Sequence, residues 1–78
     1  MRFRDLREDR DLTQQVIADH LHISQSTLSQ YENGQRQIPY NLLIKLALYF
    51  NTSTDYLLGL TNERKPYPRT PDYTKKLR

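Results

Sequence analysis

The feature that most constrains this chain is a pair of short helical segments with only three residues between them. Thr13 is a good N-cap for a helix that runs to about Leu21. Ser24 is a good N-cap for a second helix that ends near Glu32, and the Asn-Gly dipeptide that ends at Gly34 is a stop signal suited to a left-handed turn. Three residues are the length of a helix-turn-helix connection, so the spacing predicts that motif.

The rest of the folded part also favours helices, because its apolar residues recur at helical spacing and no run alternates as a half-buried strand does. We expect further helices over residues 2–10, over residues 39–50 and, after the N-cap Ser53, through Leu58. Pro39 suits the first turn of the helix over residues 39–50, because the backbone N–H that proline lacks would have no partner within the helix there. The sequence therefore predicts an all-α domain of five helices, with residues 39–50 as the spine of its core.

The size of the chain limits what it can do. Its 78 residues leave room for one small domain, and such a domain buries only about 60% of the surface that its unfolded chain exposes. An enclosed substrate pocket does not fit beside a core of that size, so we expect no catalysis, no cofactor and no small-molecule ligand. The absence of Cys favours a reducing, cytoplasmic setting, and His20 and His22 lack the further donors of a metal site. The longest apolar stretch, Leu46 to Phe50, is too short to cross a membrane.

The charge is divided unevenly along the chain. Residues 62–78 hold three of the four prolines, show no apolar periodicity and carry six basic against two acidic residues, a net charge of +4. Residues 1–61 carry six basic and seven acidic residues, a net charge of −1. We therefore expect a folded domain over 1–61 and a flexible tail over 62–78, which either contacts DNA phosphates or stays solvated. The net charge of the folded part therefore does not indicate nucleic-acid binding. Any such indication must come from where its individual side chains lie.

The second helix of the pair has one face of uncharged polar side chains. At about 100° per residue, four such residues span about 140° of the helix, namely Gln25, Ser26, Ser29 and Gln30. The opposite face holds Thr27, Leu28, Tyr31 and Glu32. Gln can pair bidentately with adenine in the major groove and Ser can serve either kind of base edge, so this face suits the reading of DNA bases. The alternative is a polar face that contacts only water.

The order of these motifs resembles a known family. The stretch LTQQVIADHLHISQSTLSQYENG of residues 12–34, the following GQRQIP and the closing LIKLALYFNTSTDYLLG are similar to the Cro and phage-repressor class, also called the XRE family, over nearly all of residues 3–60. The resemblance implies a lambda-repressor-like fold and a sequence-specific, double-stranded DNA-binding transcriptional regulator. Such a protein would be a repressor that binds a pseudo-palindromic operator as a homodimer. The alternative is an antitoxin or another protein-interaction module that also binds its own promoter.

The same resemblance implies roles for single residues. The positions that match base-reading residues are Gln25, Ser26 and Gln30, and Ser29 joins them or the backbone contacts. The positions that match contacts to the DNA backbone or the groove edge are Gln14, Thr27, Asn33, Gln35 and Arg36. Arg7 and Glu32 match a partly buried ion pair that links the first helix to the end of the recognition helix, which would explain an arginine on an apolar helix face.

The chain departs from the family at two turns and one proline. Asp11 and His22 stand where the family commonly has Gly, at the end of the first helix and between the two motif helices. Both residue types tolerate left-handed backbone better than most, so we expect the turns to be kept with mild strain. The proline after the motif is more often one residue earlier than Pro39, which leaves the start of the fourth helix open by one residue.

Overall fold

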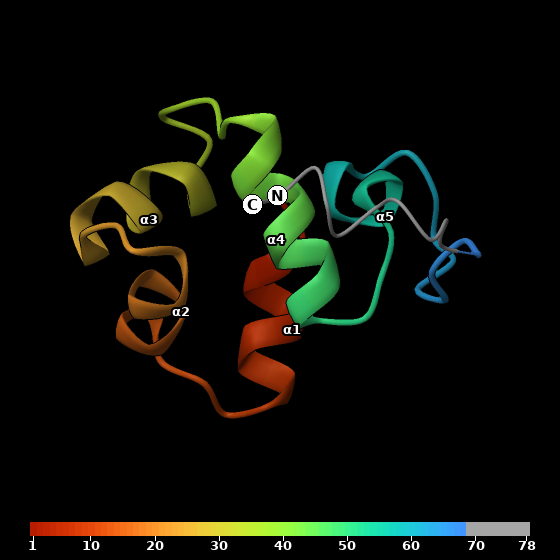
Figure 1. Ribbon diagram of the computed structural model, residues 1–78, viewed down its shortest axis with the longest axis horizontal. Helices are drawn as coiled ribbons and strands as arrows, with labels where there is room; N and C mark the ends of the chain where they lie inside the picture. Colours follow the sequence, from red (N-terminus) through yellow and green to blue (C-terminus); the bar gives the residue numbers. More distant parts are fainter. Residues whose placement is uncertain (69–78) are drawn as a thin grey trace.

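The computed structural model describes residues 1–68, which form five α-helices and no β-strand (Figure 1). The helices are α1 (Phe3–Asp9), α2 (Gln14–Leu21), α3 (Gln25–Glu32), α4 (Tyr40–Tyr49) and α5 (Thr54–Leu58). In Figure 1, α2 and α3 lie on one side of α4, and α5 lies on the other side. The predicted all-α fold of five helices is confirmed.

Three helices begin where their N-cap residues predict. The hydroxyl of Thr13 accepts a hydrogen bond from the backbone N–H of Val16 at 3.3 Å at the start of α2. Ser24 and Ser53 cap α3 and α5 in the same way, at 3.1 and 3.0 Å. Each cap satisfies one of the backbone donors that the first turn of a helix leaves free, and is worth about 1 kcal/mol.

The start of α4 differs by one residue from the prediction that Pro39 stands in the first turn. Pro39 has φ −62° and ψ 147°, so its backbone is extended and it is the N-cap. Its carbonyl oxygen accepts hydrogen bonds from the N–H groups of Leu42 and Leu43 at 3.1 and 3.0 Å. The ring fixes φ but not ψ, and the helix begins only at Tyr40, where ψ turns helical.

The turns without glycine keep left-handed geometry, as expected. Asp11 follows α1 with φ 55°, and His22 joins α2 to α3 with φ 58°. The backbone N–H of Ile23 then donates to the carbonyl of Ala18 at 3.0 Å, which closes the end of α2. Asn51, after α4, adopts φ 53° in the same manner, which the sequence analysis did not anticipate.

The core lies where all five helices meet. Its largest fully buried side chains come from every helix and are Phe3, Ile17, Leu21, Leu28, Leu46 and Leu57. Burying a side chain of this size contributes about 1.5–3 kcal/mol. The buried Leu46 and Ala47 of α4 and the adjoining Phe50 support the expectation that this helix is the spine of the core.

Residues 61–68 follow α5 and contact both α5 and α1. Arg64 donates from Nε to the hydroxyl of Tyr56 at 2.9 Å and from Nη2 to Asp9 Oδ2 at 3.2 Å, and these partners raise the pKa of Arg64. The carbonyl oxygen of Arg64 accepts from the Thr52 hydroxyl at 2.7 Å. Arg2, the N-cap residue of α1, donates from its side chain to the carbonyl of Thr61 at 2.8 Å. The boundary between domain and tail after residue 61 stays a prediction, and residues 69–78 of the expected tail lie outside the described residues.

Candidate nucleic-acid interface

The recognition helix α3 separates its two faces by burial. Leu28, Tyr31 and Glu32 are buried, while Gln25 and Ser26 are exposed and Ser29 and Gln30 are half-buried. The four uncharged polar residues that the sequence singles out therefore share the accessible side of α3. No Lys or Arg lies on this helix, so its outer face offers hydrogen-bond donors and acceptors without charge.

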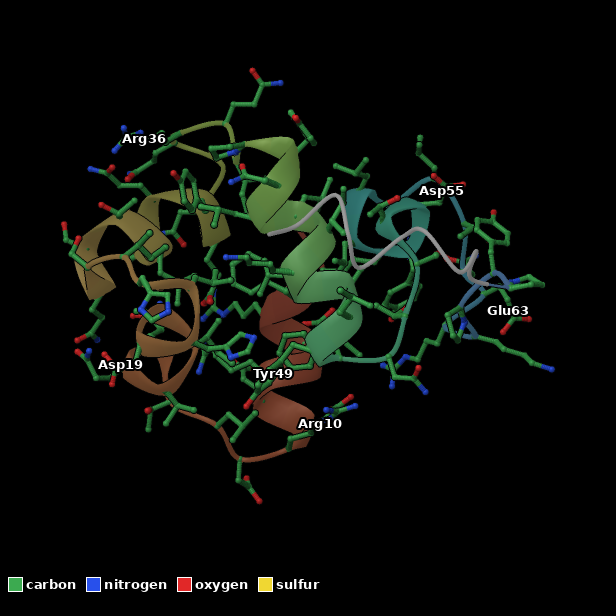
Figure 2. All side chains as sticks on the ribbon, in the orientation of Figure 1. Arg10, Asp19, Arg36, Tyr49, Asp55 and Glu63 are labelled. Atoms are coloured by element: carbon green, nitrogen blue, oxygen red, sulfur yellow. The ribbon has the colours of Figure 1, made fainter. Side chains whose placement is uncertain are left out.

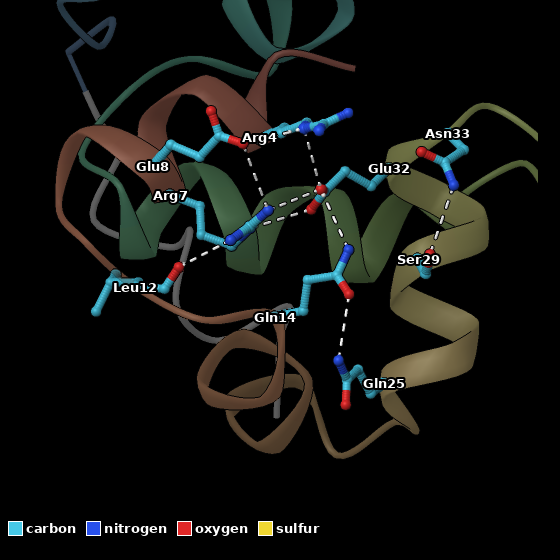
Figure 3. Close-up of polar contacts among 9 residues, drawn as sticks. All are labelled: Arg4, Arg7, Glu8, Leu12, Gln14, Gln25, Ser29, Glu32 and Asn33. Carbon is cyan, nitrogen blue, oxygen red and sulfur yellow. Dashed lines mark hydrogen bonds and ion pairs between the residues drawn. The ribbon is translucent and has the colours of Figure 1, made fainter.

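A buried carboxylate stands behind this face. The side chain of Glu32 is 2% exposed and accepts two parallel hydrogen bonds from Arg7, at 2.9 Å from Nη2 and 3.2 Å from Nε (Figure 3). The side chain of Arg7 is 12% exposed, and its Nη1 donates to the carbonyl of Leu12 at 2.9 Å. The structure thus brings together the two residues that the resemblance pairs, and this bidentate geometry is the strong form of such a contact.

Gln14 connects this buried pair to the surface. Its Nε2 donates to Glu32 Oε1 at 3.3 Å, and its Oε1 accepts from Gln25 Nε2, also at 3.3 Å (Figure 3). Gln14 and Gln25 are the first residues of α2 and α3, so two helix starts meet through their side chains. A relay of three side chains therefore runs from Glu32 to Gln25, and it links the buried pair to one residue predicted to read bases.

Each member of this relay can be identified in the sequence, but their contact cannot. The first-turn positions of Gln14 and Gln25 are readable from the N-caps before them. Whether the two amides meet depends on the angle at which α2 and α3 cross, and that angle follows from the packing of their buried faces.

The segment after α3 is held against the end of that helix. The backbone N–H groups of Gln35 and Arg36 both donate to the carbonyl of Gln30, at 2.9 and 3.2 Å. The Arg36 guanidinium lies 5.9 Å from the centre of the Tyr31 ring. Asn33, Gln35 and Arg36 are all exposed, so this turn places one cation and two amides next to the polar face of α3.

Thr27 and Ser29, both within α3, make local side-chain contacts. The hydroxyl of Ser24 donates to that of Thr27 at 2.9 Å while it caps the helix. Asn33 reaches back to Ser29, with its Nδ2 3.5 Å from the Ser29 hydroxyl oxygen. Thr27 and Ser29 are thus held in place, and both stay half-buried rather than fully exposed.

Other kinds of site find no support in the part of the chain that the structure describes. Within residues 1–68 no group of three His, Cys, Asp or Glu side chains is arranged to hold a metal ion. The ring of His20 packs on that of Tyr49, with centroids 4.6 Å apart. None of the helices of this part has the length and apolar character that a membrane crossing requires.

Comparison with known proteins agrees with this geometry. The sequence model described as helix-turn-helix matches residues 3–57. The chain is 35% identical over 65 residues to YobD of Bacillus subtilis, called an uncharacterised HTH-type transcriptional regulator, a match that covers 83% of this chain and 58% of YobD. It is 40% identical over 58 residues to the HTH-type transcriptional regulator ImmR of the same organism, covering 74% of this chain and 46% of ImmR.

A third relative is the HTH-type transcriptional regulator AnsR of Bacillus subtilis, which is 35% identical over 68 residues, covering 87% of this chain and 59% of AnsR. The chain thus spans about half the length of the curated relatives it matches. No solved structure matches it significantly.

Proposed function

The chain belongs to the helix-turn-helix family, and from that premise we propose that it is a sequence-specific regulator of transcription that binds double-stranded DNA. The observation that carries the proposal is the outer face of α3, where four uncharged polar side chains stand over a buried and rigidly held carboxylate. A helix of eight residues is about 12 Å long, close to the width of the major groove. On this proposal α3 enters that groove and reads base edges with Gln25, Ser26, Ser29 and Gln30.

The flanking residues would position the protein on the DNA backbone. Gln14 lies at the N-terminus of α2, where amide dipoles favour a phosphate, and Arg36 brings a cation to the other end of α3. Asn33 and Gln35 add neutral donors beside Arg36, and Thr27 lies at the groove edge. These contacts fix register on the duplex without carrying sequence information.

We further propose that the protein acts as a cytoplasmic, non-enzymatic repressor and binds as a homodimer. One recognition helix covers too few base pairs to single out a site in a genome, so two copies on half-sites about 34 Å apart are expected. Leu58, the last residue of α5, and Leu60, two residues beyond it, are 50% and 74% exposed, and α5 lies on the side of α4 away from α3. They offer an apolar contact that leaves both recognition helices free.

The experiment is selection of bound sequences from random duplex DNA with the full chain. An enriched pseudo-palindrome with half-sites one helical turn apart supports both reading and dimerisation, and light scattering of the complex gives its stoichiometry. An asymmetric site with one protein per duplex would contradict the homodimer. Failure to enrich any sequence, together with tight binding to a candidate toxin, would favour the antitoxin alternative.

A further inference from the structure

An open groove of about 420 Å³ lies between α2 and α4, on residues that the proposed DNA contacts do not use. Its lining residues are His20 from α2 and Lys45, Leu48 and Tyr49 from α4. Figure 2 shows Tyr49 at the C-terminal end of α4, on the side that faces α2. The ring of Tyr49 is held from behind by Phe50, with an edge-on contact of 5.1 Å between centroids, and from the side by His20.

The polar groups of this groove have no protein partners in the part of the chain that the structure describes. The side chain of Lys45, a half-buried residue, makes no hydrogen bond or ion pair with any of residues 1–68, and the same holds for the Tyr49 hydroxyl and the His20 ring nitrogens. Asp19, which precedes His20 in the sequence, accepts a hydrogen bond from Gln15 at 2.7 Å. An ammonium group that lacks a counter-ion and borders apolar side chains can form a charge-assisted hydrogen bond with an anion that enters the groove.

The other lining residues indicate the shape and polarity of an anion that this groove would bind. Leu48 and the two tilted rings present an apolar wall, on which a flat apolar body packs well. The Tyr49 hydroxyl can donate a second hydrogen bond beside the Lys45 ammonium, and two donors suit the two oxygens of a carboxylate. The volume falls within the range of small-ligand sites, about 300–1,000 Å³.

We propose that this groove binds a small planar carboxylate of the aryl-carboxylate class. The carboxylate oxygens face Lys45 and the Tyr49 hydroxyl, and the ring lies against Leu48 and the His20–Tyr49 pair. The small size of the domain leaves no room for an enclosed pocket. This groove is open at the surface and needs no space inside the core. It lies on the α2 side of α4, apart from the outer face of α3.

The test titrates the full chain with benzoate and follows the backbone amide resonances by NMR. Benzoate is expected to shift the resonances of residues 20, 45, 48 and 49 saturably, with a Kd on the order of 1 mM for so small a ligand. Benzamide has the same shape without the charge and is expected to bind about tenfold more weakly, because it lacks the charge-assisted bond to Lys45. Acetate, which lacks the ring, is expected to bind more weakly than benzoate as well.

The matched variants are Lys45→Met and Lys65→Met. Lys45→Met keeps the apolar stem and removes the charge, so it is expected to weaken benzoate binding about tenfold and leave benzamide binding unchanged. Lys65→Met removes an exposed charge outside the groove and is expected to change neither.

Three results would overturn the site: shifts that do not saturate, equal affinity for benzoate and benzamide, or full benzoate binding by Lys45→Met. Binding of an acidic peptide without binding of benzoate would assign the groove to a protein partner and overturn the proposal too. Should Lys45→Met not fold, the comparison of benzoate with benzamide on the unaltered chain still decides.

Discussion

Two arginines tie distant parts of this chain together, and they do so in opposite settings. Arg7 joins α1 to the end of α3 through Glu32, with both side chains nearly removed from solvent. Arg64 joins residues 61–68 to α1 through Asp9, and there the two side chains are 56% and 57% exposed. The N···O distances are similar, 2.9 and 3.2 Å, so distance alone does not separate the two pairs.

Burial is what separates them. Around Glu32, little water is present, and the further partners are more distant: Arg4 lies 3.7 Å from Glu32 and Glu8 lies 3.9 Å from Arg7, so a charge that loses its main partner is poorly compensated. Around Asp9, water replaces a lost partner at once, and dissolved salt screens what attraction remains. We therefore expect the loss of one partner to be costly in the Arg7–Glu32 pair and nearly neutral in the Arg64–Asp9 pair.

The first prediction concerns the buried Arg7–Glu32 pair, where we expect the greatest loss of stability. Glu32→Ala leaves the guanidinium of Arg7 buried without its carboxylate, and removal of one partner of a buried pair typically destabilises by about 3–5 kcal/mol. A domain of this size has about 5 kcal/mol of stability in all, so we expect the variant to be unfolded or nearly so in thermal denaturation followed by circular dichroism.

A double variant provides the control for that effect. Arg7→Met with Glu32→Leu removes both charges and is expected to recover a substantial part of the lost stability, because no buried charge is left unpaired. An unchanged melting temperature for Glu32→Ala would show that the pair contributes nothing in solution.

The second effect tests whether the α3 side reads DNA. Gln25→Ala is expected to weaken binding to a selected operator by about 1–3 kcal/mol and to relax preference at particular base pairs, while non-specific binding stays nearly intact. Gln30→Ala is expected to weaken binding to the operator by a similar amount and to relax preference at other base pairs. Gln15→Ala is the matched control, since Gln15 is exposed on α2 and, among residues 1–68, its side chain hydrogen-bonds to Asp19 alone. Equal loss on all sequences would reassign Gln25 to backbone positioning.

The third effect concerns the charge beyond residue 68, which lies outside the described residues. Residues 69–78 carry four basic and one acidic residue, a net charge of +3, and their deletion leaves the contacts of Arg64 in place. Affinity for DNA is expected to fall by about 0.9 logarithmic units per neutralised phosphate for each tenfold rise in salt. The deletion should make that slope shallower without changing the preferred sequence. Identical slopes would show that this segment stays away from DNA.

The last prediction concerns the exposed Arg64–Asp9 pair, where we expect only a slight loss of stability. Asp9→Ala removes the carboxylate partner of Arg64 but leaves the guanidinium bonded to the Tyr56 hydroxyl. We expect a small fall in melting temperature at low salt that vanishes near 1 M salt, where the screening length is about 3 Å. A fall as large as that of Glu32→Ala would show that exposure does not separate the two pairs.

The sequence predicts the helices well because their limits are local. Thr13, Ser24 and Ser53 act on backbone groups three residues ahead, so each helix start is decided within one turn of chain. Pro39 is the instructive miss, since a proline ring leaves ψ free to end or to begin a helix.

The site is predicted less completely, for a physical reason. The spacing on α3 identifies its polar face, and the resemblance pairs Arg7 with Glu32. The contact of Gln14 with Gln25, and the docking of Arg64 on Tyr56, join residues whose separation is set only when helices pack. The prolines after residue 61 predict a segment without a core of its own. They do not predict that Arg64, which lies between α5 and these prolines, contacts Tyr56.

The bond between Gln14 and Gln25 has a consequence for how base preference can change over evolutionary time. A residue that reads a base and touches nothing else can be exchanged freely, one substitution at a time. Gln25 is not free in this sense, because its exchange for an apolar residue also removes the partner of the Gln14 amide oxygen, and the other end of that amide is bonded to a buried carboxylate. Since the bond between the two amides is exposed, water can take the place of Gln25, so a substitution there is expected to release the side chain of Gln14 and not to destabilise the domain. Under the proposed function, a new preference at this base pair is therefore expected to be accompanied by a shift in the contact that Gln14 makes.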